Sequence, residues 1–305
     1  MRLDMNACMP NEENRENERM KTKLLELART DYENFLKMAN RLKVPYKSVR
    51  NSIFRYSCIH SYNYGVIQSK YKLEGELNAS LIENSKDFIA MEYPTKHAID
   101  CTDQLLLKSQ CGLVISLIGD HPPWEQDFLQ VSYSLDKIFS AEEFLCYVSR
   151  SGKDTSKINY RDMHEVIEKE NKNFVVERYK TKKKEDAYIF RIKCLNWVDK
   201  APPSLNMLKA IDILYKAWLL LNIESGPVIV HCLAGVGRTG TFIFYSIFRD
   251  SIVNGKIEES AEEKLFFFVD LFVKLRNKRT WMIESKEQLD FLYTVFIKNS
   301  ISEIV

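Results

Sequence analysis

A short apolar strand that leads through a glycine-containing loop into a long apolar helix constrains this chain more than any other feature. Residues 228–230 are Val-Ile-Val after the breaker pair Gly-Pro, which is typical of a buried strand. Residues 231–238 are His-Cys-Leu-Ala-Gly-Val-Gly-Arg, and the apolar run 239–248 predicts a buried helix. Unpaired N–H groups and the helix dipole at such a junction attract an anion. The segment therefore predicts a phosphate-binding loop.

This loop carries a nucleophile at one end and a cation at the other. Arg238 offers a planar fork of donors that matches two phosphate oxygens at once. The positive field at the start of the helix is expected to stabilise Cys232 as a thiolate, the nucleophilic form of cysteine. Glycines allow the backbone to curl round an anion. The loop positions expected to contact the phosphate are Leu233, Ala234, Gly235, Val236 and Gly237.

Together with His231 before it and Thr239-Gly240 after it, this Cys-x5-Arg loop resembles the signature of the classical, cysteine-dependent protein tyrosine phosphatases. The resemblance spans about residues 45 to 300. It implies one α/β (α+β) domain with a twisted mixed sheet flanked by helices. It also implies that Thr239 donates its hydroxyl to the departing thiolate and that His231 holds the loop by hydrogen bonds. Leu233 departs from the family, which has Ser at that position.

Residues 196–204, Asn-Trp-Val-Asp-Lys-Ala-Pro-Pro-Ser, resemble the mobile Trp-Pro-Asp loop of the same family. The resemblance makes Asp199 the general acid of the first step and the general base of the second, with Trp197 as a structural residue. Val198 replaces the usual Pro and Ala201 the usual Gly, which changes the backbone freedom that governs loop closure. The alternative is a surface aspartate in a proline-rich turn.

Residues 55–56 and 77–82 resemble the family's phosphotyrosine-recognition loop and its Asn-Ala-Ser strand. Tyr56 would then be the aromatic wall against which the substrate's phenyl ring packs. Such a wall deepens the pocket and favours phosphotyrosine over the shorter phosphoserine. Cys58 occupies the place of an Asp that anchors the substrate peptide, so we expect weaker anchoring. In the alternative interpretation Tyr56 is a half-buried strand residue.

Residues 275–289 resemble the family's loop in which a glutamine holds the hydrolytic water. Glu284 occupies the place of that glutamine, and Gln288 matches the family's second glutamine. The extra negative charge near a phosphoenzyme is expected to slow the second step. A solvated Glu at a helix entry is the alternative. A further acidic residue that braces Arg238 could be Glu142 or Glu143.

The pattern of polar and apolar residues, together with the extent of the resemblance, divides the chain into three regions. Residues 1–20 are expected to form a flexible polar leader, residues 21–44 a helix packed on the domain, and residues 45–300 the catalytic domain. Strands are predicted near 88–90, 112–118, 174–176 and 188–192. Helices are predicted at 207–221, 259–275 and 288–298.

Composition adds limits on partners and location. The 44 basic and 42 acidic residues nearly balance, so neither nucleic acid nor a membrane is expected as the main partner. Seven cysteines without paired spacing fit a reducing compartment, and the polar first 20 residues do not resemble a signal peptide, so a cytoplasmic location is expected. No metal-site pattern occurs, and no cofactor is expected. The oligomeric state does not follow from the sequence.

These patterns predict hydrolysis of phosphotyrosine in proteins through a cysteinyl-phosphate intermediate. One alternative is a catalytically impaired phosphotyrosine-binding substrate trap, because Leu233, Val198, Cys58 and Glu284 all depart from the family near one site. Another is a phosphatase for RNA 5′ ends or phosphoinositides, against which Tyr56 argues. The chain resembles a divergent member of the family, similar to the bracovirus-type tyrosine phosphatases of wasp viruses. That likeness implies a role in signalling and in modulation of a host cell.

Overall fold

The computed structural model describes residues 12–42, 55–56, 59, 65–84, 87–120, 125–158, 162–182, 187–221, 226–257 and 260–299. Within them seven strands form one sheet in the order β1-β2-β7-β3-β6-β5-β4. The central pairs β2–β7, β7–β3 and β3–β6 are parallel, and the outer pairs are antiparallel. The strands are β1 (Ala79–Ile82), β2 (Phe88–Met91), β3 (Leu113–Ser116), β4 (Tyr133–Ser140), β5 (Phe174–Thr181), β6 (Tyr188–Cys194) and β7 (Val228–His231).

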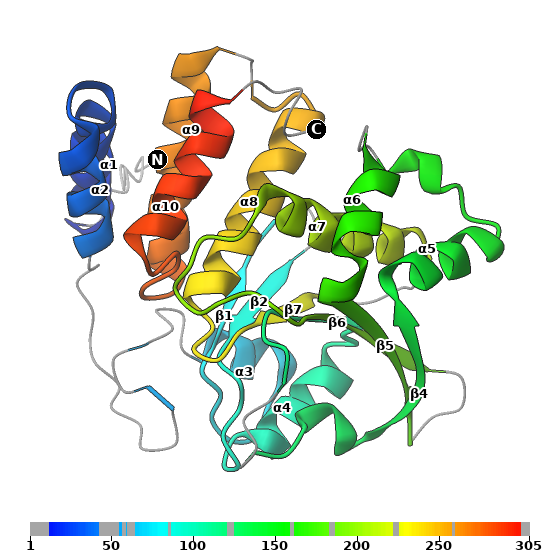
Figure 1. Ribbon diagram of the computed structural model, residues 1–305. Coiled ribbons are helices and arrows are strands. Elements are labelled where there is room, and N and C mark those ends of the chain that lie inside the picture. The colour runs from blue at the N-terminus through cyan, green and yellow to red at the C-terminus, as the bar shows by residue number, and fades with distance from the viewer. Residues whose placement is uncertain are drawn as a thin grey trace, which may run out of the picture.

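Helices cover both faces of the sheet, as buried parallel strands require. Two helices, α3 (Val66–Tyr71) and α4 (Ile99–Lys108), lie on one face, and the helices from α5 to α10 lie on the other (Figure 1). The helices of the second face are α5 (Ala141–Arg150), α6 (Met163–Glu170), α7 (Leu205–Leu220), α8 (Gly237–Val253), α9 (Ala261–Lys278) and α10 (Lys286–Tyr293). All four residues of β7 are buried, so the strand that leads into the predicted loop lies in the middle of the core.

This architecture confirms the predicted mixed sheet flanked by helices. The four strands predicted from apolar spacing are present, although β5 and β6 extend further than the sequence indicates, and β1 matches the Asn-Ala-Ser strand that the resemblance implies. The predicted helix 288–298 is instead α10 followed by one π-helical turn, Thr294–Lys298.

The N-terminal region differs from its prediction. Helix α1 (Glu12–Thr30) starts inside the stretch 1–20 where the sequence predicts a leader, and residues 1–11 lie outside the described residues. The predicted single helix 21–44 is two helices, because the Asp31 carboxylate accepts the Asn34 backbone N–H and so caps α2 (Tyr32–Arg41). The two helices form a hairpin beside α9 and α10 (Figure 1).

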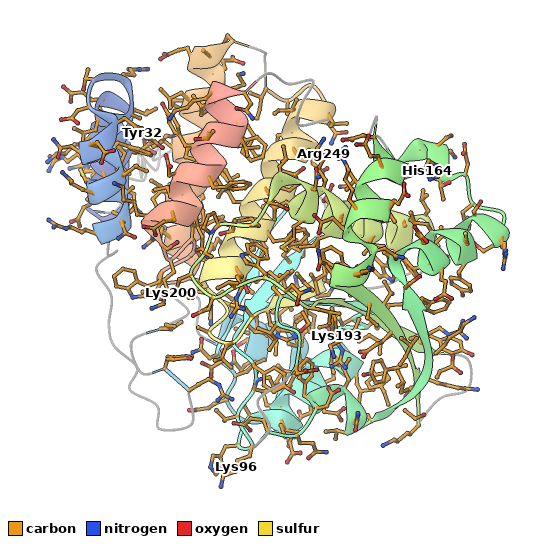
Figure 2. The ribbon with its side chains drawn as sticks, in the orientation of Figure 1. Tyr32, Lys96, His164, Lys193, Lys200 and Arg249 are labelled. Carbon is orange, nitrogen blue, oxygen red and sulfur yellow. The ribbon has the colours of Figure 1, made fainter. Side chains whose placement is uncertain are left out.

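Aromatic ring contacts and ion pairs attach this hairpin to the domain. Tyr32 lies between the hairpin and α10 (Figure 2), where its ring centroid is 4.4 Å from that of Tyr293 and its hydroxyl donates to Asp290. Lys21 pairs with Asp270 of α9 at 2.6 Å. The hairpin is therefore an integral layer of the domain.

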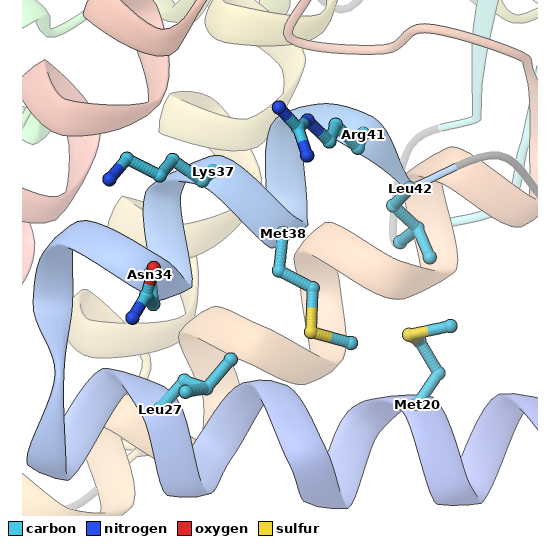
Figure 3. A pocket seen from close by; sticks show the side chains of 7 residues that line it. All are labelled: Met20, Leu27, Asn34, Lys37, Met38, Arg41 and Leu42. Atoms are coloured by element: carbon cyan, nitrogen blue, oxygen red, sulfur yellow. The ribbon is translucent and has the colours of Figure 1, made fainter.

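A groove of about 540 Å³ separates the two hairpin helices on one side (Figure 3). Met20 and Leu27 of α1 face Met38 of α2 across it, and Lys37 and Arg41 supply its basic rim. Methionine side chains adapt to irregular gaps of this kind. None of the groove's lining residues belongs to the loop that follows β7.

Replacing Phe35 by alanine tests whether the hairpin stabilises the domain. Phe35 is fully buried, with its ring centroid 5.9 Å from that of Tyr293, so the truncation leaves a cavity between α2 and α10. We expect the free energy of unfolding to fall by about 3–5 kcal/mol. Urea denaturation measures it, with the exposed Lys37→Ala on the same helix as a control expected to stay within about 0.5 kcal/mol of wild type. A loss no larger than the control's would show that the hairpin is only loosely attached.

Candidate active site

The loop between β7 and α8 forms a tight cradle. Gly235 has a φ of 70°, and a Cβ there would overlap the Met91 carbonyl and approach the backbone N of Glu92 at 2.7 Å, so only glycine fits. The Gly235 N–H donates to Cys232 Sγ at 3.2 Å. A backbone N–H directed at the sulfur stabilises its anionic form. Cys232 lies at the start of this loop and is 3% exposed.

Arg238 joins the cradle to the loop that carries Asp199. It lies in the first turn of α8, where Nη1 donates to the Trp197 carbonyl and Nη2 pairs with Asp199 Oδ1, both at 2.9 Å. These two contacts bring the Asp199 loop over the cradle. Trp197 is buried, and its indole N–H donates to the Ala201 carbonyl at 3.0 Å, which closes the loop on itself. Val198 points outward and is 69% exposed, so its replacement of proline leaves the core unchanged.

A pocket of about 500 Å³ opens above Cys232. It collects side chains from four separate segments of the chain. Its lining residues are Tyr56, Ile59, Asp199, Lys200, Cys232, Leu233, Ala234, Val236, Gly237, Trp281 and Glu284. The predicted nucleophile, general acid and aromatic wall therefore share one cavity. Leu233 is partly exposed at this cavity, and its amide carbonyl accepts the Tyr93 N–H at 2.9 Å.

Tyr56, the residue predicted to form an aromatic wall, lies at this pocket. Tyr56 lines the pocket, and burial raises the pKa of its phenol although the nearby Arg55 opposes that effect. Its hydroxyl therefore stays neutral at physiological pH. Ile59 adds a second apolar surface. The predicted anchoring position Cys58 lies outside the described residues.

The side chains of Glu284 and Gln288 lie next to the cradle at Gly237. A Cβ on Gly237 would lie 3.2 Å from Glu284 Oε2 and 3.2 Å from Gln288 Oε1, so both side chains end beside the loop. Gln288 is fully buried and its amide donates to the Ala201 carbonyl at 3.4 Å. Glu284 Oε1 lies 3.7 Å from Lys200 Nζ.

Lys200 therefore places a cation beside the Glu284 carboxylate, which the sequence does not predict. It lies beside α10 in Figure 2, and its carbonyl accepts the Ser285 hydroxyl at 2.7 Å. Its φ of 60° is in the left-handed region, which turns the chain sharply after Asp199. The Asp199 loop is thus held by residues 284–288 as well as by Arg238.

His231 and Thr239 lie beneath the cradle. His231 is 1% exposed, its Nδ1 lies 3.1 Å from the Cys232 carbonyl, and the rings of Tyr93 and Phe128 pack on it edge to face. Burial lowers its pKa to about 4, so the imidazole is neutral at pH 7. Thr239 is fully buried, and its hydroxyl makes no hydrogen bond to any of the residues that the structure describes.

Arg279 is a second arginine at the site, whose contribution the sequence analysis does not predict. Its Nε donates to the Gly235 carbonyl at 2.8 Å and its Nη2 to the Ala234 carbonyl at 3.0 Å, while its Nη1 donates to Asn78 Oδ1 at 2.7 Å. Burial lowers its pKa to about 10, so it remains a cation at neutral pH. The local sequence gives little signal for it, because Arg279 follows Arg276, Asn277 and Lys278 in a polar stretch at the end of α9.

The suggestion that Glu142 or Glu143 braces Arg238 is wrong. Both lie in the exposed first turn of α5, where the Glu143 carboxylate accepts the Ser140 N–H at 2.8 Å and completes a capping box. Among the described residues the acidic partner of Arg238 is Asp199.

Comparison with known proteins places this site in a family. The model of the protein-tyrosine phosphatase domain matches residues 53–298. The chain belongs to the protein-tyrosine phosphatase family.

Individual relatives are distant and cover parts of the chain. A putative receptor-type tyrosine-protein phosphatase mosPTP-1 of Culex quinquefasciatus is 28% identical over 131 residues, which are 42% of this chain and 8% of that protein. Receptor-type tyrosine-protein phosphatase epsilon of Rattus norvegicus is 34% identical over 105 residues, 34% of this chain and 13% of that protein. The alignments therefore span only a small part of these longer relatives.

Solved structures share the fold at lower identity. PTPN18 in complex with HER2-pY1196 phospho-peptides superposes with a TM-score of 0.60 at 15% identity, covering 92% of each chain. The Trypanosoma brucei phosphatase TbPTP1 gives a TM-score of 0.58 at 17% identity, covering 94% of this chain and 93% of its own. None of the described helices has the length and apolarity to cross a bilayer.

Proposed function

We propose that this chain hydrolyses phosphotyrosine in proteins through a cysteinyl-phosphate intermediate. The observation that carries the proposal is the convergence of Cys232, Arg238 and Asp199 on one pocket with an aromatic wall. The relatives named above are tyrosine phosphatases, which supports the same reaction class.

In the first step the Cys232 thiolate attacks phosphorus, and a sulfur–phosphorus bond forms as the bond from phosphorus to the tyrosine oxygen breaks. Asp199 gives its proton to that oxygen, so tyrosine leaves neutral. Arg238 and the loop amides hold the equatorial oxygens. A bound phosphate competes with the Asp199 carboxylate for Nη2 of Arg238, which frees the carboxylate to take up its proton.

In the second step water attacks phosphorus and the sulfur–phosphorus bond breaks. Asp199 now accepts the proton of that water, and inorganic phosphate leaves. Glu284 and Gln288 lie beside Gly237, where they can orient the water. Thr239 is placed within the first turn of α8, and its hydroxyl is available to hydrogen-bond the departing thiolate.

A pair of matched peptides tests the substrate class. Because Tyr56 and Ile59 deepen the pocket, kcat/KM for a phosphotyrosine peptide should exceed that for the same peptide with phosphoserine by at least about 100-fold. Equal values, or greater activity on an RNA 5′ phosphate or a phosphoinositide, would contradict the proposal.

The second step should depend on the Lys200–Glu284 pair. Glu284→Gln is expected to accelerate the slow phase of turnover and leave the first phase unchanged, because it removes a negative charge beside the phosphoenzyme. Lys200→Met should slow the same phase about two- to fivefold, because an exposed pair contributes little more. Stopped-flow kinetics separate the two phases.

The double variant is the control for that pair. In the Glu284→Gln background, Lys200→Met should have no further effect on the slow phase. If Glu284→Gln leaves the slow phase at the wild-type rate, Glu284 has no part in the mechanism.

Three finer points stay predictions. They are the cytoplasmic location, the likeness to wasp-virus phosphatases with its role in host-cell modulation, and the absence of nucleic acid and membrane as main partners. The impaired-trap alternative remains a distinct outcome of the kinetics: release of one tyrosine product per enzyme followed by almost no turnover.

A further inference from the structure

Glu92 is a buried carboxyl between the segment that carries Tyr56 and the loop that follows β7. It follows β2, is 2% exposed, and has no place in the mechanism above. Its Oε1 accepts the backbone N–H of Arg55 at 3.1 Å, and its Oε2 accepts the side-chain amide of Asn78 at 3.2 Å. The Arg55 N–H belongs to the residue directly before the aromatic wall Tyr56.

From Asn78 the hydrogen bonds continue into the cradle. The Asn78 carbonyl oxygen accepts from Arg279, which in turn donates to the Ala234 and Gly235 carbonyls. The backbone of Glu92 also lies against the cradle, within 2.7 Å of where a Cβ on Gly235 would stand. One continuous chain of hydrogen bonds therefore links the backbone of Arg55, next to Tyr56, to the cradle between β7 and α8.

The direction of the donors along this chain requires two acceptors at position 92. The Asn78 amide nitrogen donates to both the Ile59 carbonyl and Glu92, and its oxygen accepts from Arg279, so the amide cannot be turned round without setting donor against donor. Each carboxylate oxygen of Glu92 accepts from one of the two neighbours. A protonated acid or an amide in the same position turns a donor toward one of these two donors, so the ionised carboxylate fits both neighbours best.

We infer that Glu92 is a positioning residue that, in its ionised form, holds Tyr56 in register with the cradle and releases it on protonation. The inference rests on the proposed function, since Tyr56 matters only if the pocket binds phosphotyrosine. Burial raises the pKa of Glu92 to about 7, and Arg55, Arg279 and the Asn78 amide oppose that rise. Among the described residues, the phenol of Tyr56 also interacts with Glu92, and it stays neutral at physiological pH.

The ionisation of Glu92 sets the direction in which KM changes with pH. Above pH 7 Glu92 is ionised and both hydrogen bonds form, whereas below pH 7 the bound proton replaces an acceptor and the Arg55 N–H is released. KM for a phosphotyrosine peptide should therefore rise as the pH falls through about 7. At pH 8 Glu92→Gln should raise KM about three- to tenfold with little change in kcat, and at pH 5.5 the two proteins should agree.

Two readouts keep this inference separate from the proposed function. The pH profile of KM for a phosphotyrosine peptide is compared between wild type and Glu92→Gln, so that titration of the substrate and of other groups cancels. Hydrogen exchange of the Arg55 amide, corrected for its intrinsic rate, needs no turnover. Protection should disappear below pH 7 in the wild type and be absent at every pH in Glu92→Gln.

A second variant moves the midpoint without touching the carboxyl. Arg55→Met removes a charge that favours the carboxylate, so the midpoints of the exchange and KM profiles should shift to higher pH. Parallel profiles in wild type and Glu92→Gln, or an unmoved midpoint in Arg55→Met, would overturn the inference. Absence of turnover with the predicted exchange pattern would instead count against the proposed function alone.

Discussion

Replacing Cys232 by serine is expected to lower turnover of a phosphotyrosine peptide by at least about 10⁴-fold while the peptide still binds. A serine hydroxyl beside the Gly235 N–H is not ionised at neutral pH, so no nucleophile faces phosphorus. Arg238, the loop amides and Tyr56 are unchanged, so the affinity should remain within a few fold of the wild-type value. Steady-state kinetics and calorimetric titration measure the two quantities.

Cys146→Ser provides the matched control. Cys146 is an exposed free thiol on α5, outside the pocket, and its replacement should leave turnover unchanged. Residual activity in Cys232→Ser equal to that of the control would mean that another group attacks the phosphate.

Replacing Asp199 by asparagine should lower kcat by about 10²- to 10⁴-fold. The amide keeps the size of the side chain and can still accept from Arg238 Nη2, but it cannot give a proton to the leaving tyrosine. The loss should be largest for phosphotyrosine and much smaller for an aryl phosphate whose phenol leaves readily without protonation. The measurement is kcat across a series of aryl phosphates of differing leaving-group acidity.

Asp136→Asn is the control for this series. Asp136 lies on the outer strand β4 and pairs with Arg178 of β5, and its charge is not part of the pocket. An equal loss of kcat for good and poor leaving groups in Asp199→Asn would contradict the role of general acid.

The cradle could be predicted because its parts are contiguous. Strand, nucleophile, glycines, arginine and helix follow one another within residues 228–248, so local chemistry defines them. Asp199 and Glu284 needed the family resemblance, because nothing near either residue in the sequence shows that it meets Cys232. The ion pair that compensates Glu284 depends on a turn at Lys200 with a positive φ, which the sequence does not signal.

The chain of hydrogen bonds through Glu92 could not be predicted from any one segment of the sequence. It assembles Arg55, Asn78, Glu92 and Arg279 from four parts of the chain, and each is an ordinary polar residue in its own local sequence. Asn78, Glu92 and Arg279 share burial, which appears only once the sheet and α9 are in place.

Two features of the fold, strand β4 and the break between α1 and α2, also could not be predicted from the local sequence pattern. Strand β4 was not predicted because it is an edge strand with a bulge between Leu135 and Lys137, and most of its side chains face solvent. The division of the N-terminal helix at Asp31 reflects a cap inside an otherwise continuous apolar pattern. By contrast, buried runs such as β3 and β7 were predicted because both of their faces are apolar.

The most direct test is to detect phosphate on Cys232 itself. Mixing the enzyme with a phosphotyrosine peptide and quenching within milliseconds, followed by mass spectrometry of the fragment that contains Cys232, measures the covalent intermediate. The mechanism predicts a phosphorylated cysteine that forms at least as fast as steady-state turnover and is missing from Cys232→Ser. Turnover of the peptide without any label at Cys232, retained in the serine variant, would contradict it.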